Sequence, residues 1–281
     1  MRRLTDYSVL TFDCYGTLID WESGIWAALQ PLVSANSPSG LSRDQALHMF
    51  NQFETSQQAA SPKMSYPGVL ECVHHSLANH FGLETSRELD EAFSSSVPSW
   101  PAFPDSSEAL DLLSRHFSLV ILSNVDRAGF AASNAKLGVE FDAIYTAEDI
   151  GSYKPDPANF DFMLAHLASD LGHRKQDLIH TAQSVRHDHV PARALGLANV
   201  WIDRHRTSQA SDWGEVGSAT PFVRTDRIFF SMAEMAAAVT TEVTTARRVL
   251  QAFQDIVSVD PKQMPSAQTQ RSSPAVHPRQ T

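Results

Sequence analysis

Short apolar runs alternate with amphipathic stretches along most of the chain. Each run is short enough for a buried strand and ends in polar or turn-forming residues; the runs lie at 9–12, 118–122, 141–146, 177–182 and 198–202. Patterns with helical spacing lie between them, at about 105–116, 126–137, 157–171 and 187–196. Strands that alternate with helices indicate parallel pairing. The pattern therefore predicts an α/β protein with a Rossmann-like parallel sheet core.

The stretch from 18 to 100 breaks this alternation. It contains helical patterns separated by clusters of Ser, Pro and Gly, at 22–33, 42–56, 66–81 and 86–97. Because this block directly follows the first strand, we predict that it is an inserted helical cap domain over the end of that strand. The catalytic core would then consist of residues 1–17 and 101–245. Residues 246–281 are polar and contain four prolines, so we expect a disordered C-terminal tail.

The composition is that of a globular chain. Hydrophobic residues make up 42% and charged residues 19% of the 281 residues, and the formal net charge is -10. An acidic chain without basic runs is not expected to bind nucleic acid or a membrane. Cys14 and Cys72 lie far apart, so we expect neither a disulfide nor a structural zinc site. The sequence shows no signal peptide and no membrane-spanning run, so we expect a cytoplasmic protein.

Polar residues follow the ends of several predicted segments: Asp13, Ser123, Lys154 and Asp188. The carboxyl ends of parallel strands meet at one edge of the sheet, where small-molecule ligands bind. Taken singly, Asp13 could be a turn former, Ser123 a helix cap and Lys154 an exposed loop residue. Four such positions on separate connections can converge on one cleft, and this convergence favours an active site.

Four motifs in a fixed order resemble those of the haloacid dehalogenase-like hydrolase superfamily. They are Phe12–Leu18, Leu122–Asn124, Tyr153–Pro157 and Gln183–Asp188. The insertion after the first motif also lies where the superfamily carries its small helical cap. The resemblance implies a hydrolase whose aspartate nucleophile, Asp13, forms a covalent ester that water then cleaves.

The resemblance also implies roles for the neighbouring residues. Lys154 would keep Asp13 ionised and offset charge at the reacting centre. Thr17 would hydrogen-bond the nucleophile, and Asp188 would orient Lys154 or the hydrolytic water, or ligate a metal. Contacts to a small-molecule substrate are expected from Tyr15, Ser123, Asn124, Phe160 and Gln183.

Two positions distinguish the branches of the superfamily. Tyr15 stands two residues after the nucleophile, where the phosphatases carry a second Asp as general acid and base and the L-2-haloacid dehalogenases carry Tyr. Gln183 replaces one acid of the pair that holds Mg²⁺ in the phosphatases. The chain is therefore most similar to the type II L-2-haloacid dehalogenases, which implies dehalogenation of a 2-haloacid-like acid without a cofactor. Asp188–Arg193 and Val200–Arg204 resemble a fungal-type branch of that group.

The positions that recognise the substrate differ from those of the dehalogenases. The arginine that their cap uses for substrate or halide corresponds to Met49, and the arginines present in this cap are Arg43 and Arg87. A tyrosine after the motif lysine corresponds to Phe160, and an asparagine of the fourth motif corresponds to Val185. The shell around the substrate has therefore changed while the nucleophile and its lysine are kept.

Three alternatives stay open at this point. A Mg²⁺-dependent phosphatase would hold its metal with Asp13, the Tyr15 carbonyl and Asp188. A lyase, isomerase or cyclase on the same scaffold would release neither halide nor phosphate. A non-catalytic binding protein has no need of a nucleophile paired with Lys154. The sequence is also compatible with a homodimer.

Three further groups favour structural roles. His180, His187 and His189 lack a cysteine or second carboxylate to complete a metal site, so we predict packing and capping. Cys14 should point away from Asp13 on an extended strand, and we expect it to be buried and structural. We also assign to the core the aromatic residues Phe222, Phe229 and Phe230.

Overall fold

The computed structural model of the chain describes residues 2–38, 40–209 and 224–257. The chain divides into two compact units, Met1–Glu242 and Val243–Thr281. The first unit holds the sheet, the helices of the predicted cap and the candidate site. None of the described helices is both long enough and apolar enough to cross a membrane.

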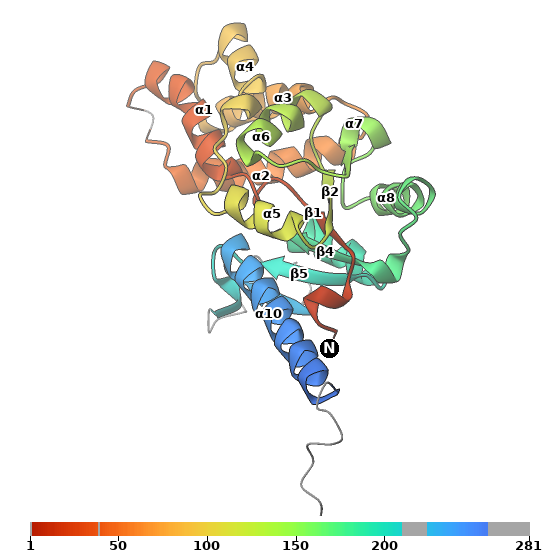
Figure 1. The fold of residues 1–281 in the computed structure, drawn as a ribbon. Coiled ribbons are helices and arrows are strands. Elements are labelled where there is room, and N and C mark those ends of the chain that lie inside the picture. Colours follow the sequence, from red (N-terminus) through yellow and green to blue (C-terminus); the bar gives the residue numbers. More distant parts are fainter. Residues whose placement is uncertain (1, 39, 210–223, 258–281) are drawn as a thin grey trace, which may run out of the picture. The chain divides into compact units, whose positions relative to one another are not determined.

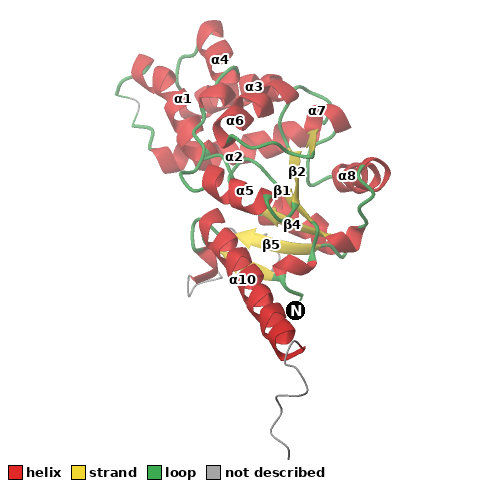
Figure 2. Ribbon diagram, viewed as in Figure 1, coloured by secondary structure: helices red, strands yellow, loops and turns green. Residues whose placement is uncertain are grey.

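The strands of the described residues form one parallel sheet of six strands (Figures 1 and 2), in the order β3-β2-β1-β4-β5-β6. Their bounds are β1 (Val9–Phe12), β2 (Ser118–Ser123), β3 (Ala143–Thr146), β4 (Leu178–Ala182), β5 (Ala198–Ile202) and β6 (Arg227–Phe229). Because helices cover both faces of such a sheet, its central strands are apolar and buried. The predicted Rossmann-like α/β class and the first five strands are confirmed.

Helices follow the strands at their carboxyl ends. They are α5 (Ser106–Ser114), α6 (Arg127–Leu137), α7 (Ala147–Ile150), α8 (Pro157–Asp170), α9 (Val190–Ala194) and α10 (Met232–Val257). Shorter 3-10 turns occur at Leu4–Asp6, Val97–Ser99, Lys175–Asp177 and Thr207–Gln209. The core beneath α8 is formed by side chains of β1, β2 and β4 together with Phe160, Met163 and Leu167 of that helix. This packing fixes the loop that precedes α8, which carries Lys154.

Four helices form the block inserted after β1. They are α1 (Trp21–Ala35), α2 (Arg43–Ala60), α3 (Tyr66–Phe81) and α4 (Arg87–Ser94), within a few residues of the predicted ranges. The two chain segments that enter and leave this block are hydrogen-bonded to each other, since Asp20 N donates to Pro101 O and Phe103 N donates to Leu18 O. The assignment of 18–100 as a separate domain stays a prediction.

Trp100 packs where the inserted helices meet the core. Its side chain is fully buried, and its ring lies edge-on to Tyr15 at 5.5 Å and to Tyr66 at 6.4 Å. Gly24 of α1 lies directly against the same ring, because a Cβ at that position would stand 2.3 Å from Trp100 Cγ. Gly24 is therefore required for the close approach of α1 to Trp100.

Several predictions of local structure were wrong. The tail does not begin at 246, because α10 continues to Val257 through a stretch without Pro or Gly; residues 258–281 lie outside the described part. The predicted helix at 187–196 is divided into a π-helical turn, Val185–His189, and α9. Phe229 and Phe230 are half-buried at the sheet edge rather than in the core, and Phe222 lies outside the described residues.

Replacing Gly24 by alanine should destabilise the protein. The added methyl group has to displace the rigid ring of Trp100, so we expect a loss of about 1–3 kcal/mol in the free energy of unfolding. Gly68→Ala in α3 is the matched control, because its Cβ would meet only the movable side chains of Met64 and Ser65. Urea unfolding of both variants measures the effect. A Gly24→Ala protein as stable as Gly68→Ala would contradict this packing.

Candidate active site

Asp13 lies immediately after β1, at the edge of the sheet where strand order reverses between β1 and β4. Its Oδ2 accepts a hydrogen bond from Thr17 Oγ1 at 2.8 Å, and Thr17 Oγ1 accepts one from Gln183 N at 2.9 Å. The turn between Asp13 and Thr17 depends on Gly16, whose φ of 92° is unfavourable for other residues. The carboxylate is thus held by a loop that is itself fixed to the end of β4.

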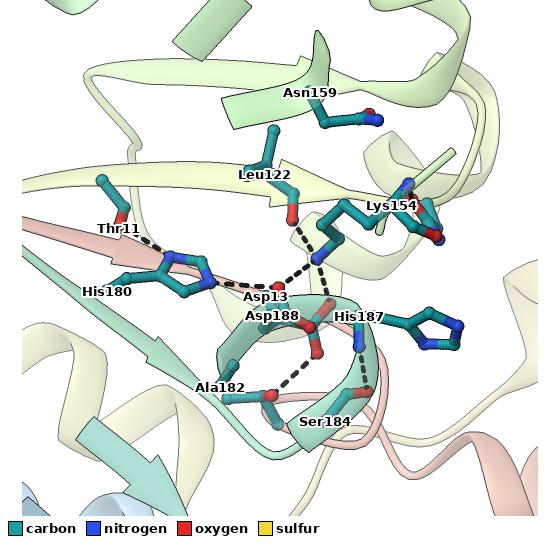
Figure 3. A network of polar contacts seen from close by, with 12 residues as sticks. Thr11, Asp13, Leu122, Lys154, Asn159, His180, Ala182, Ser184, His187 and Asp188 are labelled. Carbon is teal, nitrogen blue, oxygen red and sulfur yellow. Dashed lines mark hydrogen bonds and ion pairs between the residues drawn. The ribbon is translucent and has the colours of Figure 1, made fainter. Parts of the chain in front are cut away.

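Lys154 lies at the centre of the site (Figure 3). Its Nζ donates to Asp13 Oδ1 at 2.9 Å, to Asp188 Oδ1 at 2.6 Å and to Leu122 O at 2.8 Å. These contacts use every N–H of the ammonium group. The side chain is 1% exposed, so the charge is screened very little by water. The structure therefore brings together Asp13, Lys154 and Asp188 as the sequence predicted.

Asn124 fixes the backbone of Lys154. Lys154 N donates to Asn124 Oδ1 at 2.7 Å, and Asn124 Nδ2 donates to Lys154 O at 2.9 Å. Both ends of the amide are therefore used within the protein. Asn124 thus positions the lysine in this structure, and its substrate contact stays a prediction.

Asp188 is held from a second side by a histidine of β4. His180 Nε2 lies 3.0 Å from Asp188 Oδ1, and His180 Nδ1 lies 2.8 Å from Thr11 Oγ1. His180 is buried and packs against Phe160 as predicted, but its bonds to Asp188 and Thr11 were not predicted. A signal existed in the sequence: Thr11 and His180 are polar residues inside otherwise apolar strands. His189 behaves as predicted, since it is buried and bonds the carbonyl of Ala182.

The charges of the site are unequally compensated. Burial raises the pKa of Asp13 above its usual range, although Lys154 and Thr17 act in the opposite direction. Burial also opposes ionisation of Asp188, but Lys154 and His180 outweigh it and hold the pKa of Asp188 below its usual range. One ammonium thus faces two carboxylates, and Asp13 is the less stabilised of the two. A poorly solvated carboxylate of this kind is suited to act as a nucleophile.

Two buried oxygen atoms of the site have no hydrogen-bond partner among the described residues: Ser123 Oγ and Asp188 Oδ2. An unsatisfied buried polar group costs roughly 1–3 kcal/mol. Such atoms commonly mark places where water or a ligand binds. Ser123 belongs to the residues predicted to bind substrate, and its hydroxyl is free to donate to a ligand in this structure.

The other predicted contact residues are engaged elsewhere. The Tyr15 hydroxyl lies 2.9 Å from Ser133 Oγ. Phe160 is fully buried in the core, with its ring edge-on to His180 at 5.1 Å. Gln183 acts through its backbone, which holds Thr17 and accepts a hydrogen bond from a tryptophan of β5. Phe160 therefore packs against His180, the Gln183 backbone holds Thr17, and the substrate contacts of both residues stay predictions.

Cys14 is fully buried, carries a free thiol and does not form a disulfide with Cys72. Burial raises the pKa of the Cys14 thiol well above its usual range. Since the thiolate is the reactive form of cysteine, this environment makes Cys14 unreactive. The predicted structural role of Cys14 is confirmed.

The cap arginines are bound to other groups. Arg43 is 44% exposed and lies 3.9 Å from Glu22, and Arg87 is 84% exposed and lies 2.6 Å from Glu91. Within the described part of the chain, the side-chain hydrogen bonds and ion pairs of Asp13 come from Thr17 and Lys154 alone. In this structure the cap therefore supplies no cation to Asp13.

A carboxylic acid of the inserted helices, Glu54, lies near the loop that carries Lys154. Glu54 Oε1 accepts a hydrogen bond from the Tyr66 hydroxyl at 2.7 Å, and burial raises the pKa of Glu54 to about 7. Tyr153, which precedes Lys154, donates its hydroxyl to Met64 O at 2.7 Å. This bond connects the loop that carries Lys154 to the segment between α2 and α3.

The predicted alternative ligands for Mg²⁺ do not fit a cation site well. Mg²⁺ requires several oxygen ligands in octahedral geometry. Both oxygens of Asp13 and Oδ1 of Asp188 already accept hydrogen bonds from the protein, which leaves Asp188 Oδ2 and the Tyr15 carbonyl, fewer than octahedral Mg²⁺ requires. Among the residues that the structure describes, no cluster of three His, Cys, Asp or Glu is arranged to hold a metal ion. We derive no step through a metal.

Comparison with known proteins agrees with this arrangement. A family model for haloacid dehalogenase-like hydrolases matches residues 7–175, which is more than half of the chain. The chain is 29% identical over 163 residues to an (S)-2-haloacid dehalogenase of Burkholderia cepacia; the match covers 54% of this chain and 65% of that protein, just under two thirds of its length.

Solved structures share the fold. An L-2-haloacid dehalogenase of Xanthobacter autotrophicus with covalently bound chloropropionic acid has a TM-score of 0.66 and 16% identity, covering 83% of this chain and 98% of that one. A dehalogenase with an intermediate complex has a TM-score of 0.67 and 20% identity, covering 84% and 97%. A Bacillus subtilis protein assigned to the same hydrolases and bound to magnesium has a TM-score of 0.65 and 16% identity, covering 85% and 100%.

The raised pKa of Glu54 predicts a pH-dependent change in stability. The carboxyl has an ordinary pKa of 4.5 and a folded-state pKa of about 7, so its contribution is fully present below 4.5 and is lost as pH rises through about 7. Because Glu54 is half-buried, we expect wild type to lose about 1–2 kcal/mol relative to Glu54→Gln between roughly pH 5 and pH 8.

Urea unfolding at both pH values measures this difference. Glu71→Gln on the exposed side of α3 is the control for the same chemical change. A constant difference between wild type and Glu54→Gln over this pH interval would show that the Glu54 carboxyl has no raised pKa.

Proposed function

We propose that this chain, a member of the haloacid dehalogenase-like hydrolase family, removes halide from a 2-haloacid-like small organic acid through an ester of Asp13. The observation that carries this proposal is the buried contact between Asp13 and Lys154 at 2.9 Å. Asp13 also stands at the carboxyl end of β1, at the reversal of strand order where ligands bind in open α/β sheets, and Thr17 holds its second oxygen.

The first step is a displacement at carbon. A carboxylate oxygen of Asp13 attacks the carbon that bears the halogen, the new C–O bond forms, and halide leaves with the electron pair of the C–X bond. Halide needs no proton to leave. The Tyr15 hydroxyl, which bonds Ser133, therefore has no acid role to fill at the leaving group. An in-line attack inverts the configuration at that carbon.

The second step is hydrolysis of the ester. Water attacks Cγ of esterified Asp13, and the bond between Cγ and the product oxygen breaks, which regenerates the carboxylate and releases the 2-hydroxy acid. Asp188 Oδ2 is the unpaired acceptor available to this water. The proton that Asp188 takes from water passes to solvent after the product has formed.

The substrate carboxylate needs a donor in this site. Arg43 and Arg87 lie beside Glu22 and Glu91, whereas Ser123 Oγ of the core is buried and unpaired among the described residues, and we assign the donor role to Ser123. The relatives support this substrate class, since one is an (S)-2-haloacid dehalogenase and another carries covalently bound chloropropionic acid. We also propose a cytoplasmic location, in keeping with the free thiols of Cys14 and Cys72.

The proposal is tested with a panel of 2-haloacids and phosphorylated metabolites, each with EDTA or with Mg²⁺, scored for halide and phosphate release. We expect halide release that neither addition changes. Asp13→Asn should lower the rate by at least about 10³-fold because the amide is not a nucleophile. Asp170→Asn, at the exposed end of α8, is the matched control. Phosphate release that requires Mg²⁺, or an active Asp13→Asn enzyme, would contradict the proposal.

A further inference from the structure

We propose that His180 and Thr11 are positioning residues that hold Asp188 for hydrolysis of the ester. This inference rests on the proposed function, because it concerns the second half of that reaction. Neither residue touches the reacting atoms; both act through Asp188.

The sheet places the two residues side by side. Thr11 of β1 is the direct partner of His180 in β4 within the parallel register. Side chains two residues apart on a strand point to the same face, so Thr11 and Asp13 share the face on which His180 lies. Figure 3 shows the resulting chain of contacts from Thr11 through His180 to Asp188 and Lys154. Each of these side chains is nearly inaccessible to solvent.

The hydrogen bonds determine how the imidazole ring is held. An ionised Asp188 can only accept, so the hydrogen between it and His180 is carried by Nε2 of the ring. Thr11 Oγ1 can then donate to Nδ1, which fixes the tautomer. Phe160 packs against the ring at a centroid distance of 5.1 Å. A ring held on three sides presents one donor to one oxygen of Asp188.

Both donors to Asp188 lie on the same oxygen. Lys154 Nζ and His180 Nε2 lie 2.6 Å and 3.0 Å from Oδ1, and Oδ2 is left without a partner although the residue is fully buried. This asymmetry orients the carboxylate so that Oδ2 is free to accept from water. Lys154 alone would leave the group able to turn about its Cβ–Cγ bond.

The role of His180 increases after the first chemical step. Formation of the ester removes the negative charge of Asp13, so Lys154 loses one of its two anionic partners. Leu122 O and Asp188 remain as its acceptors, so the lysine is held less firmly on the side of Asp13. The side-chain hydrogen bonds of His180 join Thr11 and Asp188 and do not involve Asp13, so formation of the ester removes neither of them.

The atoms of the assisted step balance. The water oxygen bonds to Cγ of the Asp13 ester, and one water proton goes to Asp188 Oδ2. The Cγ–O bond to the substrate carbon then breaks, and the second water proton passes from the restored carboxyl to the departing alkoxide. Asp188 finally gives its proton to solvent, so halide and one proton are the net by-products.

Four variants test the assignment with 2-chloropropionate as the probe. His180→Leu removes the donor, His180→Gln keeps an N–H donor, and Thr11→Val removes only the bond to Nδ1. His74→Leu is the matched control, because His74 is a buried cap histidine that bonds Asp90 at 2.6 Å. Rapid quenching followed by intact-mass measurement detects the ester on Asp13, and halide and hydroxy acid are followed separately.

We expect His180→Leu to release one halide per site at close to the wild-type rate and to form hydroxy acid at least about tenfold more slowly. The ester should accumulate in this variant and not in His74→Leu. His180→Gln should recover most of the lost rate, and Thr11→Val should show a smaller defect in the same step. If His180→Leu does not fold, the slower ester hydrolysis expected of Thr11→Val tests the assignment in its place.

Three results would overturn the assignment. They are no ester in His180→Leu and Thr11→Val, a first-turnover release of halide slowed as much as hydroxy acid formation, and a His180→Gln variant as slow as His180→Leu. A wild-type enzyme that releases no halide from any 2-haloacid would instead overturn the proposed function, and the positioning role with it. Halide release by wild type without ester in the variants overturns the positioning role alone.

Discussion

One ammonium group buried between two carboxylates sets the requirements for the rest of this structure. Lys154 contacts Asp13 and Asp188 at 2.9 and 2.6 Å with almost no access to water. Removing such charges from water costs several kcal/mol for each ion unless hydrogen bonds complete their shells. The surrounding sheet supplies such a bond, since Leu122 O accepts a hydrogen bond from the third N–H of the Lys154 ammonium group. Asn124, which follows β2, fixes the backbone of Lys154.

The sequence was sufficient to predict that Asp13, Lys154 and Asp188 come together, because their meeting depends on topology more than on detail. Asp13, Lys154 and Asp188 each lie at or beyond the carboxyl end of a strand, and a parallel sheet brings such positions together whatever the side-chain rotamers. The apolar runs that predict β1, β2 and β4 are buried on both faces, so their identity was unambiguous. The fold class and the cluster of Asp13, Lys154 and Asp188 therefore follow from pattern and motif.

The contacts between side chains were harder to predict. Asn124 looked like a substrate donor, but it bonds the lysine backbone, which depends on how the two loops are folded. The pairing of Thr11 with His180 depends on β4 lying beside β1, and a sequence of alternating strands and helices does not give strand order. A short edge strand such as β6, half-exposed and three residues long, carries too few apolar positions to stand out.

The covalent ester is the central claim, and the fate of solvent oxygen tests it most directly. With enzyme in excess over 2-chloropropionate in H₂¹⁸O, water attacks Cγ of Asp13, so the oxygen that enters the product comes from the protein. We predict unlabelled 2-hydroxypropionate and one ¹⁸O in the peptide that contains Asp13. Labelled product with unlabelled peptide would show that water attacks the substrate directly, and Asp13 would then not be the nucleophile.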